Sequence, residues 1–260
     1  MPYTFGDNRE ASRRLRRLAE VYEPETRDLL RSVQSIRGPR AFALAVDLGC
    51  GPGWSTELLA ETLRARRTVG LEASETYVAE ARANHPQLEF LRHDILVAPF
   101  PAGQPDLLFC RFLLTHLPSP RAALEAWAGA AASGAILVIH ETEALHSSHS
   151  SLSRYYQMVA QMQKHHGQEL HVGALLDAAF DGTDWKVLST ESVTLQKSAR
   201  DMAQLHAANL RTWGKNDFAL RTFGKDEIDR LEKDLDQLAS GSECAGVVLN
   251  TAKRVIAEHK

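Results

Sequence analysis

The sequence predicts an α/β protein built on a doubly wound, mostly parallel sheet. Residues 43–48 form a short apolar run of the kind that is typical of a buried parallel strand. Gly49, Gly51 and Gly53 follow at alternate positions, which allows a tight turn and a close approach of the backbone to a ligand. Residues 54–60 then begin a helix, so the loop lies at a helix N-terminus, where unpaired N–H groups point outward. Strand, glycine turn and helix form the opening half of a nucleotide-binding βαβ unit.

The acids beside this loop indicate which kind of nucleotide binds. Asp47 closes the strand directly before the glycines, where a carboxylate would repel a pyrophosphate and attract an ammonium or sulfonium group. The spacing G-x-G-x-G also differs from that of dinucleotide loops, which disfavours a nicotinamide dehydrogenase. A second strand over 67–71 ends at Glu72, and an acid there suits hydrogen bonds to both ribose hydroxyls. The pattern predicts a ligand with a ribose and a positive charge but no phosphate.

Strands and helices continue to alternate up to residue 140. Ser74 is the expected cap of the helix after the second strand, and Ser119-Pro120 is the start signal of a later helix. A proline-rich loop precedes the fourth strand, which ends in the cleft where open α/β sheets bind ligands. The expected elements are a helix over 75–84, a strand over 88–92, a strand over 106–112, a helix over 119–131 and a strand over 134–140.

The two ends of the chain are predicted to be largely helical. At the N-terminus we expect a helix over 9–21, a break at Pro24 and a second helix over 25–35. Arginines cluster in the first of these helices and are interpreted as a solvated face: Arg9, Arg13, Arg14, Arg16 and Arg17. Beyond residue 140 we expect helices over 150–165, 173–180, 199–214 and 225–239, with strands over 185–196 and 245–256.

Four motifs in this order resemble the class I S-adenosylmethionine-dependent methyltransferases. They are Val46-Asp47-Leu48-Gly49-Cys50-Gly51-Pro52-Gly53, Gly70-Leu71-Glu72-Ala73-Ser74, His93-Asp94-Ile95, and Asp106 to Arg111 followed by Leu114-Thr115-His116-Leu117-Pro118. The resemblance implies a Rossmann-like, seven-stranded sheet in the order 3-2-1-4-5-7-6. A helical cap is expected before the last strand. We expect one domain over 1–260, with N-terminal helices in 1–40, a cofactor-binding core in 41–140 and the cap in 141–183 and 197–243.

The resemblance also implies a cofactor, S-adenosylmethionine, with S-adenosylhomocysteine as the product. In the family, an acid at the place of Asp94 accepts a hydrogen bond from the adenine amino group, and Ile95 would give an apolar surface beside it. Backbone near Arg111 would meet the methionine portion, and Tyr22 would reach the cleft from the N-terminal helices. The expected cofactor-binding residues are Tyr22, Asp47, Gly49, Cys50, Gly51, Gly53, Glu72, Ala73, Asp94, Ile95 and Arg111.

The implied activity is in-line methyl transfer to oxygen or nitrogen of a small molecule enclosed by the cap. His116 follows the fourth strand by one short turn and is the candidate general base, since histidine ordinarily titrates near neutral pH; a positioning role is the alternative. His140, with Glu141, is a second candidate at the end of the fifth strand. The histidines between residues 140 and 171 lack the spacing of zinc ligands, so no metal is expected. The candidate substrate residues are Tyr155, Tyr156, Asn209 and Trp213.

Composition narrows the partners. The net charge of −3 and the sequence pI near 6.4 disfavour a nucleic-acid partner. The three cysteines show no disulfide or metal spacing, and no signal peptide or membrane span is expected, which favours a cytoplasmic enzyme. Three alternatives stay open: methylation of RNA or protein, a scaffold that binds the cofactor without using its methyl, and a cyclase that uses the cleft. The sequence also leaves open whether the protein forms a homodimer.

Overall fold

A seven-stranded sheet with the strand order β3-β2-β1-β4-β5-β7-β6 organises the structure, a computed structural model that describes residues 6–7, 9–38, 41–241 and 246–260. Strands β3, β2, β1, β4 and β5 are parallel to one another, and β7 is antiparallel to both β5 and β6. This is the fold class that the sequence predicts. The strands are β1 Leu44–Leu48, β2 Arg67–Glu72, β3 Glu89–Arg92, β4 Leu107–Arg111, β5 Ile136–Ser147, β6 Trp185–Ser198 and β7 Val247–His259.

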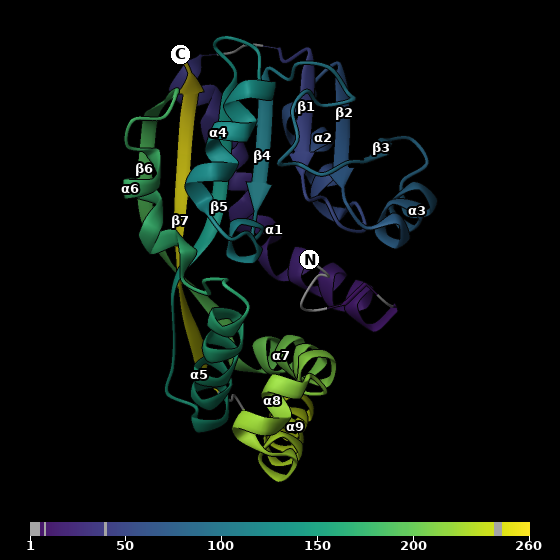
Figure 1. Ribbon diagram of the computed structural model, residues 1–260, viewed down its shortest axis with the longest axis vertical. Coiled ribbons are helices and arrows are strands. Elements are labelled where there is room, and N and C mark those ends of the chain that lie inside the picture. The colour runs from purple at the N-terminus through teal and green to yellow at the C-terminus, as the bar shows by residue number, and fades with distance from the viewer. Residues whose placement is uncertain (1–5, 8, 39–40, 242–245) are drawn as a thin grey trace.

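Helices cover both faces of the sheet, so the sheet is doubly wound (Figure 1). On one face Leu30 of α1 and Leu59 of α2 pack against the sheet; on the other, Trp127 of α4 and Phe180 of α6 do so. The helices are α1 Arg9–Arg37, α2 Trp54–Leu63, α3 Glu75–Asn84, α4 Pro120–Ala130, α5 Ser150–His165, α6 Leu176–Phe180, α7 Ala199–Trp213, α8 Asp217–Phe223 and α9 Lys225–Ser240, with 3-10 turns η1 Leu114–His116 and η2 Val172–Leu175.

The first helix corrects one expectation, because α1 runs through Pro24 without a break. Proline inside a helix removes one backbone hydrogen bond and destabilises the helix by about 3 kcal/mol. Here the turns on both sides are held by packing: Tyr22 and Leu30 are buried, and the Thr26 hydroxyl donates to the Tyr22 carbonyl at 2.8 Å. Tertiary burial therefore outweighs the local signal, and α1 can reach from the sheet to the cap.

The fifth strand is also longer than expected. It was predicted to end at His140, but β5 continues to Ser147 because it stays paired with β7 as far as Ser147 opposite Val248. His140 lies opposite Arg111, the last residue of β4, so everything after it overhangs the carboxyl edge of the sheet. The overhanging parts of β5, β6 and β7 lead into the cap (Figure 1).

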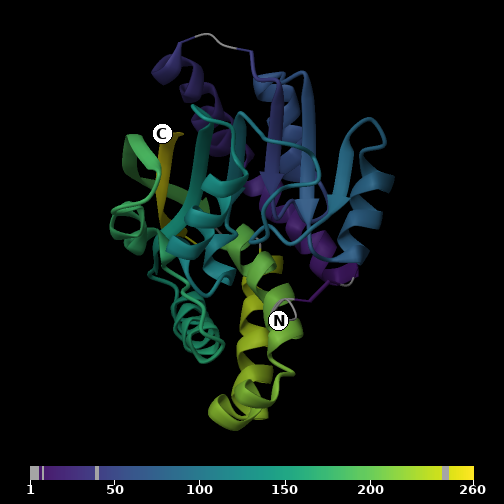
Figure 2. The ribbon, with the colours of Figure 1, turned by 45° about the horizontal axis from the view of Figure 1, so that its top comes forward.

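Four helices, α5, α7, α8 and α9, form the cap below the carboxyl ends of the strands (Figures 1 and 2). The cap has its own apolar core, in which Leu210, Trp213, Ile228 and Leu235 are buried. The N-terminal half of α1 lies against α7, where Arg17 forms an ion pair with Asp201 at 2.6 Å. The insertion of helices before the last strand is as predicted, with α8 as an element that the sequence did not indicate.

Candidate functional site

A cavity of about 640 Å³ lies between the carboxyl edge of the sheet and the cap. The loops after β1, β2, β3 and β4 line its upper part, and α1, α5 and α7 line the rest. This is the edge at which open α/β sheets bind ligands. The cavity therefore has two ends: one formed by the glycine loop and the strand-end acids, and one formed by the cap helices.

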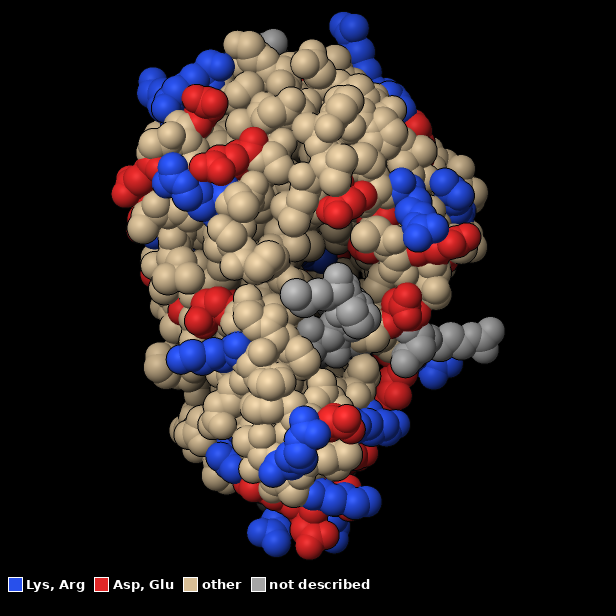
Figure 3. Space-filling model, viewed as in Figure 1, with Lys and Arg blue, Asp and Glu red and all other residues tan. Residues whose placement is uncertain are grey.

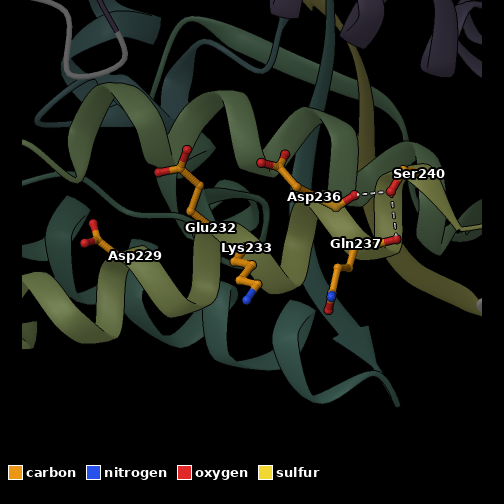
Figure 4. Close-up of a pocket in the computed structure, with 6 residues that line it drawn as sticks. All are labelled: Asp229, Glu232, Lys233, Asp236, Gln237 and Ser240. Carbon is orange, nitrogen blue, oxygen red and sulfur yellow. Dashed lines mark hydrogen bonds between the residues drawn. The ribbon is translucent and has the colours of Figure 1, made fainter.

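A second, open groove along α9 has none of these features (Figure 4). Its side chains lie on the solvent side of one helix, and the Ser240 hydroxyl donates back to the Asp236 and Gln237 carbonyls. Glu232 and Asp236 are already paired with Arg211. The groove shares no lining residue with the large cavity, so we read it as a solvated helix face.

Asp47 lies beneath the glycine loop and does not itself line the cavity. It is 1% exposed, and its Oδ2 accepts hydrogen bonds from the hydroxyls of Ser55 and Thr56, both at 2.7 Å. Burial raises the pKa of Asp47 to about 6, and the nearby Arg111 charge opposes that rise. The carboxylate thus fixes the start of α2 against the end of β1, and any ligand above the loop would feel its charge.

The glycine loop has the backbone shape that its sequence predicts. Gly49 has φ 64°, and a Cβ there would come within 2.5 Å of the Leu113 side chain, so this position packs tightly against the β4 loop. Gly51, with φ 53°, lines the cavity together with Cys50. Gly53 also has a positive φ, but it caps α2 and does not line the cavity, which gives it a conformational part.

Glu72 lines the cavity beside the glycine loop. Its Oε2 accepts from the Gly51 N–H at 3.0 Å and its Oε1 from the Ser74 N–H at 2.8 Å, so both oxygens are oriented by backbone. Burial raises the pKa of Glu72. A carboxylate oxygen has more than one acceptor position, and each oxygen of Glu72 can therefore also accept from a ligand hydroxyl.

The loop after β3 forms the adjoining wall. Asp94 is exposed at the cavity rim, and its Oδ1 accepts from the Leu96 N–H at 3.0 Å. Ile95 is buried beside it, and its carbonyl accepts from the Trp127 indole N–H at 3.1 Å. Ala73 lines the cavity between this loop and Glu72. The polar Asp94 and the apolar Ile95 therefore lie side by side in the lining of the cavity, as the sequence predicts.

Tyr22 of α1 and Arg111 of β4 both line the cavity, close to each other. The Tyr22 hydroxyl accepts from the Asn250 amide at 2.6 Å, and burial raises the pKa of Tyr22. Arg111 lines the cavity, while its guanidinium donates to the Thr26 hydroxyl at 3.3 Å. Burial lowers the pKa of Arg111, and the Asp47 charge raises it.

Glu141 of β5 binds the backbone of the loop after β4. Its Oε1 accepts from the N–H groups of Leu113 and Leu114 at 2.7 and 2.8 Å, and the residue is fully buried. Burial raises the pKa of Glu141 to about 7. In the same loop, the Thr115 hydroxyl donates to the carbonyl of Glu169, which follows α5, at 2.8 Å. The loop that carries His116 is thus attached to both the sheet and the cap.

The two candidate bases lie in different surroundings. His116 lines the cavity, and burial together with the Arg14 charge lowers its pKa to about 3. His140 does not line the cavity: it is in the middle of β5, fully buried, with its Nδ1 3.4 Å from the Thr26 hydroxyl. The prediction that His140 stands at a strand end was wrong, because β5 continues beyond it.

Three of the four candidate substrate residues line the cap end of the cavity: Tyr155, Tyr156 and Asn209. Trp213 does not, since it is buried in the cap core, with its ring centroid 6.1 Å from that of Tyr155. His206, which the sequence did not single out, also lines this end. Its ring stacks on Tyr155 at 4.3 Å, and its Nε2 lies 3.1 Å from the Tyr156 hydroxyl.

Arg14 is the main functional candidate that the sequence reasoning missed. It was expected on a solvated helix face, but it is 8% exposed and lines the cavity. Its Nη1 donates to the Asn209 Oδ1 at 2.7 Å. The available signal was helical spacing: Arg14 precedes Leu18 and Tyr22 at intervals of four, which puts all three on one face. By contrast, Arg13 is exposed as expected.

Metal ligation and membrane insertion have no counterpart in the part of the chain that the structure describes. Within it, no three His, Cys, Asp or Glu side chains form a group that could hold a metal ion. None of its helices is long and apolar enough to cross a membrane. On the face in Figure 3, basic and acidic side chains are intermixed over both the sheet-bearing part and the cap.

Comparison with known proteins agrees with the fold and the glycine loop. Residues 45–134 match the family model of a methyltransferase domain. A trans-aconitate 2-methyltransferase from Paracidovorax citrulli (strain AAC00-1) is 39% identical over 100 residues, which is 38% of this chain and 38% of that protein. In three of the curated relatives, the matched segment spans 38 to 46% of the relative's own length.

Two solved structures share the architecture at low identity. The (4+2)-cyclase SpnF has a TM-score of 0.58 and 16% identity, covering 92% of this chain and 82% of that one. Phosphoethanolamine N-methyltransferase 2 from Haemonchus contortus, in complex with phosphomonomethylethanolamine and S-adenosylhomocysteine, has a TM-score of 0.52 and 15% identity, covering 90% and 52%. At these identities the likeness shows the fold. The family match shows a methyltransferase domain over residues 45–134, within a sheet that has the strand order expected of a Rossmann-like methyltransferase.

Proposed function

We propose that the protein transfers a methyl group from S-adenosylmethionine to a carboxylate oxygen of a small organic acid. The observation that carries this proposal is the single cavity with two chemically different ends. At the sheet end the two carboxylates of Glu72 and Asp94 outnumber the one guanidinium of Arg111, whereas Arg14 is the charged residue at the cap end among the lining residues that the structure describes. A cationic cofactor fits the first end, and an anionic acceptor fits the second.

The residues at the sheet end fit this cofactor. Glu72 presents a carboxylate that two backbone N–H groups already orient, as two adjacent ribose hydroxyls require. Gly51 leaves its side of the cavity open, since a Cβ would occupy that space. When bound, S-adenosylmethionine supplies an electrophilic methyl group on a positively charged sulfur. In the proposed arrangement Asp94 and Ile95 hold the adenine, and backbone beside Arg111 meets the amino acid portion.

The state of His116 favours a carboxylate acceptor over an alcohol, a phenol or an ammonium group. With a pKa of about 3, the imidazole is neutral throughout the physiological range and is a weak proton acceptor. A carboxylate is ionised at neutral pH and needs no proton removed before it attacks. His116 is then a positioning residue, which matches the alternative that the sequence left open.

The cap provides the enclosure that such a transfer needs. Methyl transfer gains mainly from alignment of the two reactants and from exclusion of water. Tyr155 and Tyr156 are 2% and 6% exposed and form rigid walls at the cap end. Gln163 is also buried, and its amide donates to the Thr115 hydroxyl at 3.2 Å, which ties α5 to the β4 loop. A cavity of this size between the sheet and the cap favours a small acceptor over RNA or protein.

The substrate of the relatives supports the acceptor class. The relatives are trans-aconitate 2-methyltransferases, although the matched segments cover less than half of each chain. The likeness to a cyclase shows that the fold alone does not decide between methyl transfer and other uses of the cleft. A direct activity screen separates these readings.

The test is S-adenosylhomocysteine formation with a panel of carboxylic acids, amines and alcohols. We expect turnover with di- and tricarboxylic acids, trans-aconitate among them, and methyl esters as products by mass spectrometry. Turnover with amines or alcohols alone would refute carboxylate methylation. Tight binding of the cofactor with no turnover on any acceptor would favour a non-methylating use of the cleft.

A further inference from the structure

We infer that Arg14, oriented by Asn209, binds a second carboxylate of the acceptor and so selects acids with at least two carboxylates. The inference rests on the proposed function and names the residue that would give it specificity. It starts from the position of Arg14 on α1, one turn before Leu18 and two turns before Tyr22, on the helix face that lines the cavity.

The guanidinium is buried, lines the cavity and is held in a defined direction. Arg14 is 8% exposed, and its Nη1 donates to the Asn209 Oδ1 at 2.7 Å. Arginine can only donate, so this bond fixes which end of the Asn209 amide is oxygen. The Asn209 amide also lies beside the Tyr155 hydroxyl. A planar guanidinium held this way can present further N–H groups to a carboxylate in the two-point geometry that arginine favours.

Among the described lining residues that α1, α5 and α7 contribute, Arg14 is the one Asp, Glu, Lys or Arg. The charge of Arg14 acts on both His116 and His206, whose pKa values are lowered to about 3 mainly by burial and further by that charge. This places the guanidinium between the β4 loop and α7. The acidic lining residues, Glu72 and Asp94, belong to the opposite end of the cavity.

Two further polar atoms point to a ligand at this end. Gln163 is 1% exposed, and its Oε1 has no hydrogen-bond partner within the described part of the chain. His206 is 9% exposed, and the same holds there for its Nδ1. Both residues line the cavity. Buried polar atoms are nearly always paired. The His206 Nδ1 can carry the ring N–H and donate to a carboxylate of the acceptor, whereas the Gln163 Oε1 only accepts and needs a donor group other than an ionised carboxylate.

The two carboxylates of the acceptor would then have different tasks. One lies near the β4 loop, where its oxygen attacks the methyl carbon, the carbon–sulfur bond breaks and the bonding electrons remain on sulfur. The products are a neutral methyl ester and neutral sulfur, so no proton has to move. The other carboxylate stays ionised against Arg14 and holds the molecule in register. A monocarboxylate would lack this second point of attachment.

The test is isothermal titration of trans-aconitate into the protein saturated with S-adenosylhomocysteine, for wild type, Arg14→Met, Arg14→Lys and Arg13→Met. The complex cannot react, so binding is measured apart from methyl transfer. We expect Arg14→Met to weaken binding about 10- to 100-fold, because a charge-assisted, two-point contact is lost. Arg14→Lys keeps the charge without the fork and should lie between. Arg13→Met removes the same charge from an exposed neighbour and should bind as wild type does.

The outcomes separate the two proposals. Equal affinity in wild type and Arg14→Met would overturn the inference, whether or not the protein methylates acids. Failure of trans-aconitate to bind the wild-type complex would overturn it as well. Selective loss in Arg14→Met without methyl transfer to any acid would support the anchor and refute the proposed reaction. The affinity for S-adenosylhomocysteine, measured first in each variant, shows whether that variant is folded. If Arg14→Met does not bind S-adenosylhomocysteine, Arg14→Lys replaces it in the test, and an affinity of Arg14→Lys for trans-aconitate equal to that of wild type would overturn the inference.

Discussion

Replacement of Glu72 by alanine should weaken cofactor binding through the ribose in particular. The carboxylate accepts from the N–H groups of Gly51 and Ser74 at 3.0 and 2.8 Å, and it faces the cavity beside the glycine loop. Alanine removes both the proposed ribose contacts and these two backbone contacts. A loss of affinity for S-adenosylhomocysteine could therefore come from the missing ribose contacts or from a disturbed glycine loop, and a second ligand without the ribose hydroxyls separates the two causes.

The size of the ribose part follows from the hydrogen bonds that disappear. At about 0.5–1.5 kcal/mol for each hydrogen bond, net of competition with water, the two hydrogen bonds from the ribose hydroxyls contribute about 1–3 kcal/mol. This corresponds to a roughly 5- to 150-fold weaker affinity for S-adenosylhomocysteine. For the 2′,3′-dideoxy analogue, which lacks both hydroxyls, only the part due to the disturbed loop should remain.

Isothermal titration of both ligands into wild type and Glu72→Ala forms a thermodynamic cycle in which the effect on the loop cancels. The matched control is Glu75→Ala, an exposed acid at the start of α3 whose side chain pairs with Arg92. We expect a coupling energy between Glu72 and the hydroxyls and none for Glu75. An equal loss for both ligands in Glu72→Ala would refute the ribose contact and leave Glu72 as a support of the loop.

Three other changes test the site more briefly. His116→Gln should lower single-turnover methyl transfer by less than about tenfold, with no histidine-like inflection in the rate against pH; a loss of about 10²–10⁴ and an inflection present only in wild type would restore a general base. Glu141 has a pKa raised from 4.5 to about 7, so its protonated form stabilises the fold at low pH and that contribution is lost as the pH rises through 7. Urea titrations should show the wild-type free energy of unfolding falling relative to Glu141→Gln by about 3 kcal/mol between pH 4.5 and 7; parallel curves would contradict this. Dialysis against a chelator should leave activity intact, and loss that one divalent ion restores would overturn the metal-free expectation.

The core of the fold was predictable because its signals are local. The apolar run of β1, the alternate glycines and the acid that ends β2 each occupy a few consecutive residues, and parallel strands bring their carboxyl ends to one edge. Glu72, Asp94 and Gly51 therefore all line the cavity, as expected of strand-end residues. The helix starts at Ser74 and Ser119 followed from cap residues, and both side chains accept from the helix backbone as predicted.

What the sequence did not indicate depends on contacts between distant segments. β5 continues past His140 because β7, more than a hundred residues later, pairs with it. α1 passes through Pro24 because the turns around it pack on the sheet and the cap. Trp213 faces the cap core, and not the cavity, because α9 and α8 pack on that side of α7. Asp47 and Gly53 are placed by packing and backbone shape beneath the loop, so proximity in sequence overstated their contact with the cavity.

Arg14 is a further residue whose burial depends on a contact with a distant segment. Its neighbours in sequence form a basic cluster, which suggested a solvated face, but α7 covers one side of α1 and buries this residue alone among the described arginines of that cluster. The residue next to it, Arg13, stays exposed. In a helix that contacts two other parts of the molecule, the burial of each arginine depends on the helix face on which it lies. The number of charges along the chain does not indicate which arginine points inward.

The most direct test of the account is a single-turnover reaction with the protein in excess over S-adenosylmethionine that carries a trideuterated methyl group, with trans-aconitate as the acceptor. We expect mass spectrometry to find the label in a methyl ester of the acid, formed in step with S-adenosylhomocysteine. Recovery of unreacted, protein-bound S-adenosylmethionine in the presence of saturating acid would contradict carboxylate methylation. If an amine and an alcohol are added as competing acceptors, label on either of them and none on the acid would contradict it as well.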